Sequence, residues 1–122
     1  MKTVLVVDDE VGLADALGDV LRDEKFDVRI ARNGMDGLKR VHEQRPDLIL
    51  LDYMMPIMDG CEMLKALRAD ASYRDIPVLL MSAVATSNIP ADCTVTAFLR
   101  KPFDIDTLMA ELERLGMTRS PK

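Results

Sequence analysis

The stretch that decides the fold is Val4-Leu5-Val6-Val7-Asp8-Asp9, in which four apolar residues are followed directly by two carboxylates. An unbroken apolar run of this length is typical of a parallel strand that is covered on both faces. Two similar runs follow, Leu48-Ile49-Leu50-Leu51 before Asp52 and Val78-Leu79-Leu80-Met81 before Ser82. The three runs predict three central strands, each of which ends at a polar side chain.

The pattern between these runs is helical, so strands and helices alternate along the chain. Val28 and Ile30 flank an arginine, which predicts an edge strand, and residues 95–99 predict a fifth strand. Residues between Ser82 and Thr96 show no helical stripe and include Pro90, so a helix there should be short, irregular or mobile. Apolar stripes predict helices that contain residues 13–21, 35–41, 63–67 and 105–115, the second and last of them capped by Asn33 and Asp104. The sequence predicts an α/β fold with a five-stranded parallel sheet and helices on both faces.

Length, charge and composition exclude or disfavour several classes of protein for this chain. The chain has 122 residues, enough for one domain, and a net charge of −5 without a basic cluster, which disfavours direct binding to nucleic acid. It contains no apolar run long enough to cross a membrane. It has one histidine, which is too few for a multi-histidine metal site. Cys61 and Cys93 lie far apart without CxxC spacing, so we expect two reduced thiols in a cytoplasmic protein. Residues 118–122 are expected to form a polar tail.

Polar residues at the strand ends carry the chemistry. The carboxyl ends of parallel strands meet at one edge of the sheet, where open α/β folds bind their ligands. Two carboxylates 4 Å apart repel by about 4 kcal/mol at an effective dielectric of about 20. Such a cluster therefore needs a cation, and oxygen ligands suit Mg²⁺. An aspartate beside Mg²⁺ can accept a phosphoryl group. The residues expected to converge are Asp8, Asp9, Asp52, Ser82 and Lys101.

Each of these residues also has an ordinary structural explanation when it is taken alone. Asp8 and Asp9 could cap a helix, Asp52 and Ser82 could serve a turn, and Lys101 could be a surface charge. The complete set, in order at four strand ends, favours a site.

Five segments together give the chain a family resemblance. From Met1 to about Leu115 it resembles the receiver domain of two-component response regulators, which implies a domain over residues 1–117. It also implies a flavodoxin-like, doubly wound sheet of order 2-1-3-4-5, in which the fourth helix would here be short or irregular. The matching segments are Val6-Val7-Asp8-Asp9-Glu10, Leu50-Leu51-Asp52-Tyr53-Met54-Met55-Pro56, Asp59-Gly60, Ser82-Ala83 and Lys101-Pro102-Phe103.

The resemblance assigns roles to the acidic residues. Asp52 is implied as the phosphoacceptor. Mg²⁺ would be held by Asp9, Asp52 and the main-chain oxygen of Met54, with Asp8 acting mainly through water. A phosphohistidine on a sensor histidine kinase or a histidine phosphotransfer protein would supply the phosphoryl group.

It also assigns roles at the fourth and fifth strands. Ser82 and Lys101 would bind the phosphoryl oxygens, and the peptide bond between Lys101 and Pro102 would be cis. Phe98 matches an aromatic switch position, whose ring would move inward as Ser82 is drawn toward the phosphoryl group. An ordinary aromatic residue on an edge strand is the alternative for Phe98.

Two positions are implied to set how long the phosphoryl group survives. Met54 and Val84 lie two residues after Asp52 and Ser82, and neither side chain can orient a water molecule. We therefore expect slow self-dephosphorylation, in a phosphoacceptor that is not a turnover enzyme.

Four interpretations of the function compete. The chain is expected to be a stand-alone receiver that relays phosphate or switches the binding of a protein target, without direct contact with nucleic acid or membrane. It could also be a receiver from a larger regulator. An aspartyl phosphatase of the haloacid-dehalogenase type would usually place a second aspartate where this chain has Met54, and a degenerate receiver would lack the full acidic set.

Overall fold

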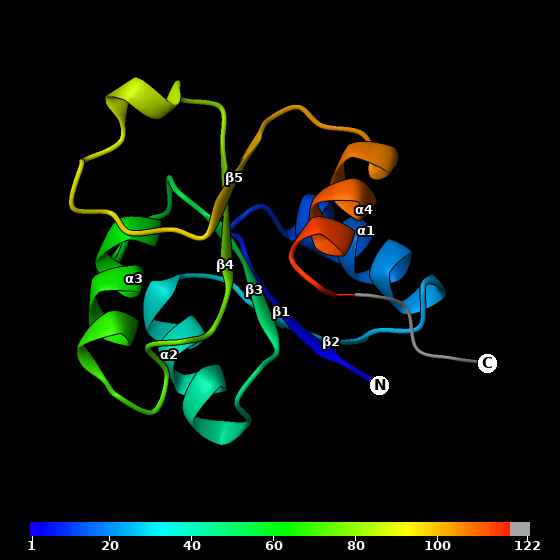
Figure 1. Cartoon of the computed structure of the whole chain (residues 1–122), viewed down its shortest axis with the longest axis horizontal. Coiled ribbons are helices and arrows are strands. Elements are labelled where there is room, and N and C mark those ends of the chain that lie inside the picture. The colour runs from blue at the N-terminus through cyan, green and yellow to red at the C-terminus, as the bar shows by residue number, and fades with distance from the viewer. Residues whose placement is uncertain (118–122) are drawn as a thin grey trace.

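The computed structural model describes residues 1–117, so the expected polar tail at residues 118–122 lies outside the described residues. Its centre is a parallel sheet of five strands in the order β2-β1-β3-β4-β5 (Figure 1), as the sequence predicts. The strands are β1 (Thr3–Val7), β2 (Asp27–Ala31), β3 (Leu48–Asp52), β4 (Val78–Ser82) and β5 (Ala97–Arg100).

Helices cover both faces of the sheet. Figure 1 shows α1 and α4 on one face and α2 and α3 on the other. Alternate residues of β1 explain this arrangement, because Val4 and Val6 belong to the core cluster under α1 and α4, whereas Leu5 and Val7 belong to the cluster under α2 and α3. Within the described residues, no helix is long and apolar enough to span a membrane. The helices are α1 (Val11–Asp23), α2 (Gly34–Glu43), α3 (Gly60–Ala69) and α4 (Ile105–Arg114).

Local caps fix where the helices begin. The side chain of Asn33 accepts a hydrogen bond from the backbone N–H of Asp36, and Asp104 accepts one from Thr107. Both caps are those that the sequence predicts. Asp59 forms a capping box with Glu62 at the start of α3, and so ends the loop that follows β3.

The two edge strands differ in character. β2 alternates as predicted, with Val28 buried and Arg29 exposed. β5 is shorter and begins at Ala97, two residues after the predicted start. Just before it, the backbone N–H of Thr96 donates to the main-chain oxygen of Val78, and the hydroxyl of Thr96, in place of a main-chain oxygen, accepts from the N–H of Val78.

The connection between β4 and β5 contains one turn of 3₁₀ helix, Thr86–Asn88, and no α-helix. The prediction of a short or irregular helix is confirmed. Its predicted mobility stays a prediction.

The prediction of two reduced thiols is wrong, because Cys61 and Cys93 form a disulfide. Cys61 lies in the first turn of α3, and the irregular connection before β5 brings Cys93 over it, with the two Cα atoms 5.2 Å apart. The pairing was not predicted because the two cysteines are 32 residues apart in the sequence and because Cys93 lies in a connection without a regular helix.

Gly60 is required by a close backbone approach beneath Asp52. A Cβ at Gly60 would lie 2.5 Å from the main-chain oxygen of Asp52 and 3.1 Å from the Cα of Tyr53. We expect Gly60→Ala to lower the free energy of unfolding by about 2 kcal/mol, since backbone cannot yield as a flexible side chain does. Urea denaturation measures the change.

Gly12→Ala is the matched control for that experiment. Gly12 also lies in the first turn of a helix, and nothing lies within 4 Å of its Cβ position. Alanine there should raise the free energy of unfolding by about 0.5–1 kcal/mol. Equal effects of the two substitutions would contradict the close approach at Gly60.

Candidate functional site

Three carboxylates converge at the carboxyl edge of the sheet. Asp8 and Asp9 follow β1 directly, and Asp52 is the last residue of β3, the strand paired with β1. One carboxylate oxygen from each residue lies within 4.8 Å of the others. Asp8 and Asp52 are buried, whereas Asp9 is exposed. The sheet order therefore produces the acidic cluster that the sequence predicts.

Lys101 reaches this cluster from the edge strand β5, which is separated from β3 by β4. It follows β5, and its Nζ lies 3.1 Å from Asp52 Oδ1 and 3.2 Å from Asp8 Oδ2. The peptide bond between Lys101 and Pro102 is cis. One ammonium group thus bridges two buried carboxylates that come from different strands.

The electrostatics of the cluster leave an excess of negative charge. Three carboxylates and one ammonium sum to −2 when all are ionised. Burial, followed by the charge of Asp8, raises the pKa of Asp52 to about 6, although Lys101 opposes the shift. Burial alone would lower the pKa of Lys101, but the charges and hydrogen bonds of Asp52 and Asp8 outweigh it and raise that pKa above its ordinary value.

The free oxygens of the cluster fit a hard divalent cation. Asp8 already accepts hydrogen bonds, from the backbone N–H of Glu10 at 2.9 Å and from Lys101. The carboxylate of Asp9 accepts no hydrogen bond within residues 1–117, and it faces solvent. Carboxylate oxygens with this excess charge match the ligands that Mg²⁺ prefers.

The structure does not bring the Ser82 hydroxyl onto the carboxylates. Its Oγ accepts a hydrogen bond from the backbone N–H of Val84 at 2.9 Å. Phe98 is 41% exposed on β5, and a small cavity of about 30 Å³ is lined by both Ser82 and Phe98. The side chain of Met54, in the loop after Asp52, is 65% exposed.

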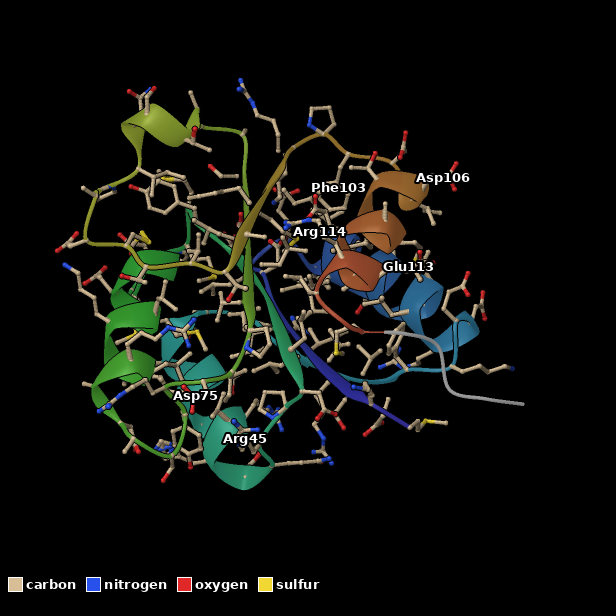
Figure 2. The ribbon with its side chains drawn as sticks, in the orientation of Figure 1. Arg45, Asp75, Phe103, Asp106, Glu113 and Arg114 are labelled. Carbon is tan, nitrogen blue, oxygen red and sulfur yellow. A yellow bond between two sulfur atoms is a disulfide. The ribbon has the colours of Figure 1, made fainter. Side chains whose placement is uncertain are left out.

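Two features of the site escape sequence reasoning. The first is Glu10, whose Oε1 lies 3.9 Å from Nζ of Lys101. The run Asp8-Asp9-Glu10 was the sequence signal that could have indicated this contact. A groove of about 430 Å³ opens beside Lys101, between α1 and the start of α4. Leu13, Leu17 and Phe103 give it an apolar lining, and Figure 2 shows Phe103 between β5 and α4.

Comparison with known proteins gives the same family throughout. A family model described as the response regulator receiver domain matches residues 4–113. The DNA-binding response regulator MtrA of Mycobacterium tuberculosis (strain ATCC 25618 / H37Rv) is 36% identical over 112 residues, which are 89% of this chain and 48% of MtrA. RpaA of Synechocystis, a DNA-binding dual master transcriptional regulator, is 32% identical over 94% of this chain and 49% of its own length. The chain spans about half the length of these curated relatives.

Solved structures share the fold closely. Chemotaxis protein CheY4 of Vibrio cholerae superposes with a TM-score of 0.88 and 31% identity, over 93% of this chain and 98% of that one. The receiver domain of sensor histidine kinase PA1611 from Pseudomonas aeruginosa has a TM-score of 0.85 and 26% identity, over 93% and 95% of the two chains. That structure holds a magnesium ion coordinated in the active site cleft.

Proposed function

Since the chain belongs to the response regulator receiver family, we propose that Asp52 accepts a phosphoryl group from a phosphohistidine on a partner protein. The partner is a sensor histidine kinase or a histidine phosphotransfer protein, and the modified chain passes the group on or switches the binding of a protein target. The observation that carries this proposal is the buried Asp52 carboxylate, 3.1 Å from the ammonium group of Lys101 in a cluster of net charge −2.

Each charged residue has a task in this transfer. A carboxylate oxygen of Asp52 attacks phosphorus and the phosphorus–nitrogen bond breaks. The donor imidazole takes up a proton and so leaves as a neutral group. Lys101 stabilises the negative charge on the phosphoryl oxygens. Asp8 holds Lys101 in place through its second carboxylate oxygen. The carboxylates of Asp9 and Asp52, the main-chain oxygen of Met54 and, through water, Asp8 would hold Mg²⁺, which neutralises charge on the transferred group.

Ser82 and Phe98 supply the switch in this proposal. The phosphoryl group would draw the Ser82 hydroxyl away from Val84, to which it is now bonded. The exposed ring of Phe98 would then move into the small cavity that both residues line. A movement of this kind changes the surface over β5 that a partner meets.

The proposed partners of this domain are proteins. A net charge of −5 repels a nucleic-acid backbone. The apolar groove between α1 and α4 adjoins Lys101, so a donor that lies in it would come close to Asp52. Both receivers joined to a larger regulator and receivers of this length occur among the similar proteins.

Incubation with acetyl phosphate and Mg²⁺, followed by intact mass measurement, tests the proposal. We expect a mass gain of one phosphoryl group. Because an acyl phosphate hydrolyses readily, this gain should not be stable to acid, as labelling of another kind of residue would be. The gain should vanish in Asp52→Asn and on removal of Mg²⁺ with a chelator. Asp15→Asn, on the exposed side of α1, is the matched control and should label normally. Full labelling of Asp52→Asn would overturn the assignment.

Slow self-dephosphorylation is a separate prediction. Met54 and Val84 flank the site with apolar side chains that cannot direct water at phosphorus. Polar residues at both positions, Met54→Asn with Val84→Gln, should shorten the half-life of the phosphorylated chain by about tenfold or more. The decay of the mass gain after the phosphodonor is removed measures this.

Ile57→Asn is the control for that experiment. Ile57 lies in the same loop as Met54, is 79% exposed and has a positive φ of 71°, which asparagine tolerates. It should leave the half-life unchanged. If the double variant decays as slowly as the original chain, then the apolar pair does not control access of water.

A further inference from the structure

The connection that replaces a helix between β4 and β5 is attached weakly to the rest of the protein. We call residues 83–96 the β4–β5 segment. Within the described chain, every backbone hydrogen bond of residues 85–95 joins two residues of this segment. Its backbone therefore gains no support from α3 or from the sheet over these eleven positions.

Side chains provide the attachments that remain. Cys93 forms the disulfide with Cys61 of α3. Asp92 pairs with Lys65 at 2.7 Å, but both side chains are more than half exposed, so this ion pair contributes little. Ile89 is buried in the core cluster under α2 and α3, and Val95 packs against the same cluster. The disulfide is thus the one covalent link between the segment and the helix below it.

The same segment is continuous with the proposed phosphoryl switch. It begins directly after Ser82 and ends directly before the strand that carries Phe98. Within it, the backbone N–H of Val84 donates a hydrogen bond to Ser82 Oγ at 2.9 Å, and the Ser82 hydroxyl lies 3.4 Å from the main-chain oxygen of Val84. The anchor at Cys93 lies further along the same segment, so a change in how firmly the segment is held acts on Ser82 through the backbone between Val84 and Cys93.

We propose that the Cys61–Cys93 pair is a reversible redox-modification site, at which a dithiol reductant releases the β4–β5 segment and so eases the movement of Ser82 toward a phosphoryl group. The effect on Ser82 rests on the proposed function, whereas the release of the segment does not. Disulfides that serve as sensors rather than as staples act in this reversible way.

The chemical step is a thiol–disulfide exchange. A thiolate of the reductant attacks one cysteine sulfur, the Cys61–Cys93 bond breaks, and the departing cysteine takes up a proton. The second thiol of the reductant then attacks the mixed disulfide, which frees the other cysteine as a thiol. The reductant leaves as a cyclic disulfide, so two electrons and two protons pass to the protein. Because both cysteines are at least nine-tenths buried, the attack requires local opening of the segment, which its few contacts permit.

Hydrogen exchange of the full chain tests the release. Amides of residues 83–96 should exchange about tenfold or more faster after reduction with dithiothreitol than in the oxidised protein. Peptides from β1 and β3 should keep the same protection in both forms. Cys61→Ala/Cys93→Ala is the matched variant, and it should exchange rapidly in the segment whether or not the dithiol is present. If this variant fails to fold, then the reduced wild-type chain supplies the comparison.

Binding of beryllium fluoride with Mg²⁺, a mimic of the phosphoryl group, tests the link to Ser82. The reduced chain should bind the mimic about fivefold more tightly than the oxidised chain. By reciprocity, the bound mimic should shift the thiol–disulfide equilibrium toward the dithiol by the same factor. Lys65→Met, which breaks the exposed ion pair on the segment, should leave the ratio between the two forms unchanged.

Three results would overturn the proposal. One is the finding of two free thiols after air oxidation, because no disulfide would then exist to be reduced. Another is exchange in residues 83–96 that is the same in both forms, or that accelerates equally in β1 and β3. Equal affinity of the two forms for the mimic would remove the effect on Ser82. If the mimic binds neither form and acetyl phosphate labels neither, then the proposed function fails together with that effect, while the exchange data still decide the release of the segment.

Discussion

Lys101→Met is expected to lower the free energy of unfolding by about 3–4 kcal/mol at pH 7.5 in the absence of Mg²⁺, the largest change that we expect at the site. Lys101 is 15% exposed and bridges two carboxylates, of which Asp8 is fully buried. Methionine keeps the length of the side chain but leaves the buried carboxylates without a cation. Urea denaturation at several pH values measures the loss.

The pH dependence of this loss has a definite sign. The pKa of Asp52 is about 6 with Lys101 in place, and Lys101 holds it down, so the variant should raise it further. Protonation of Asp52 then removes part of the uncompensated charge. The part of the cost of Lys101→Met that comes from Asp52 should therefore shrink as the pH falls from the raised pKa of the variant toward about 6, and it should be gone below that value. Mg²⁺ should also restore stability, because it replaces the missing positive charge.

Lys65→Met is the control, since Lys65 also forms an ion pair with an aspartate but on the surface. Its removal should change stability little, because solvent screens an exposed pair. A loss at Lys101 no greater than the loss at Lys65 would mean that the cluster does not depend on its lysine.

Asp52→Asn should have the opposite effect and raise the free energy of unfolding by about 2–3 kcal/mol at neutral pH. The pKa of Asp52 is about 6 in the folded chain, against an ordinary value of 3.8, so the folded protein binds the proton more tightly than the unfolded chain does. The contribution of Asp52 to the stability of the wild type should therefore fall as the pH rises from about 4 to about 6. Asparagine removes the ionisation and with it this loss.

The pH profile distinguishes this explanation from a general improvement in packing. The gain from Asp52→Asn should be complete above about pH 7 and absent below about pH 4, where both states of the wild type are protonated. Asp15→Asn, at an exposed position of α1, should leave the stability profile nearly unchanged. A gain of the same size at every pH would contradict the electrostatic origin. Mg²⁺ should narrow the difference, because it stabilises the wild type by binding to the ionised cluster.

The fold and the convergence of the acidic residues could be predicted because they depend on local pattern. Apolar runs such as Val4–Val7 identify buried strands by themselves, and parallel order then brings Asp8 and Asp52 to the same edge. Lys101 could be placed for the same reason, since it follows the fifth strand.

What could not be predicted depends on contacts between segments that are distant in the sequence. The Cys61–Cys93 bond forms because a connection without an α-helix passes over α3, and no local pattern encodes that path. The Ser82 hydroxyl bonds Val84 in this structure, which a list of strand ends cannot reveal. The approach of Glu10 to Lys101 likewise depends on a side-chain conformation rather than on a spacing.

The edges of the sheet have a consequence for the behaviour of the protein at high concentration. β2 has a neighbouring strand on one side alone, and its sequence places the charges of Asp27 and Arg29 on this edge strand, while Arg22 donates to the main-chain oxygen of Val28. A second molecule that tried to extend the sheet there would have to desolvate these charges, and such residues are a common defence against self-association through strands. The opposite border, β5, is only four residues long and carries Arg100. Both edges of the sheet therefore carry charged residues that disfavour the addition of a further strand.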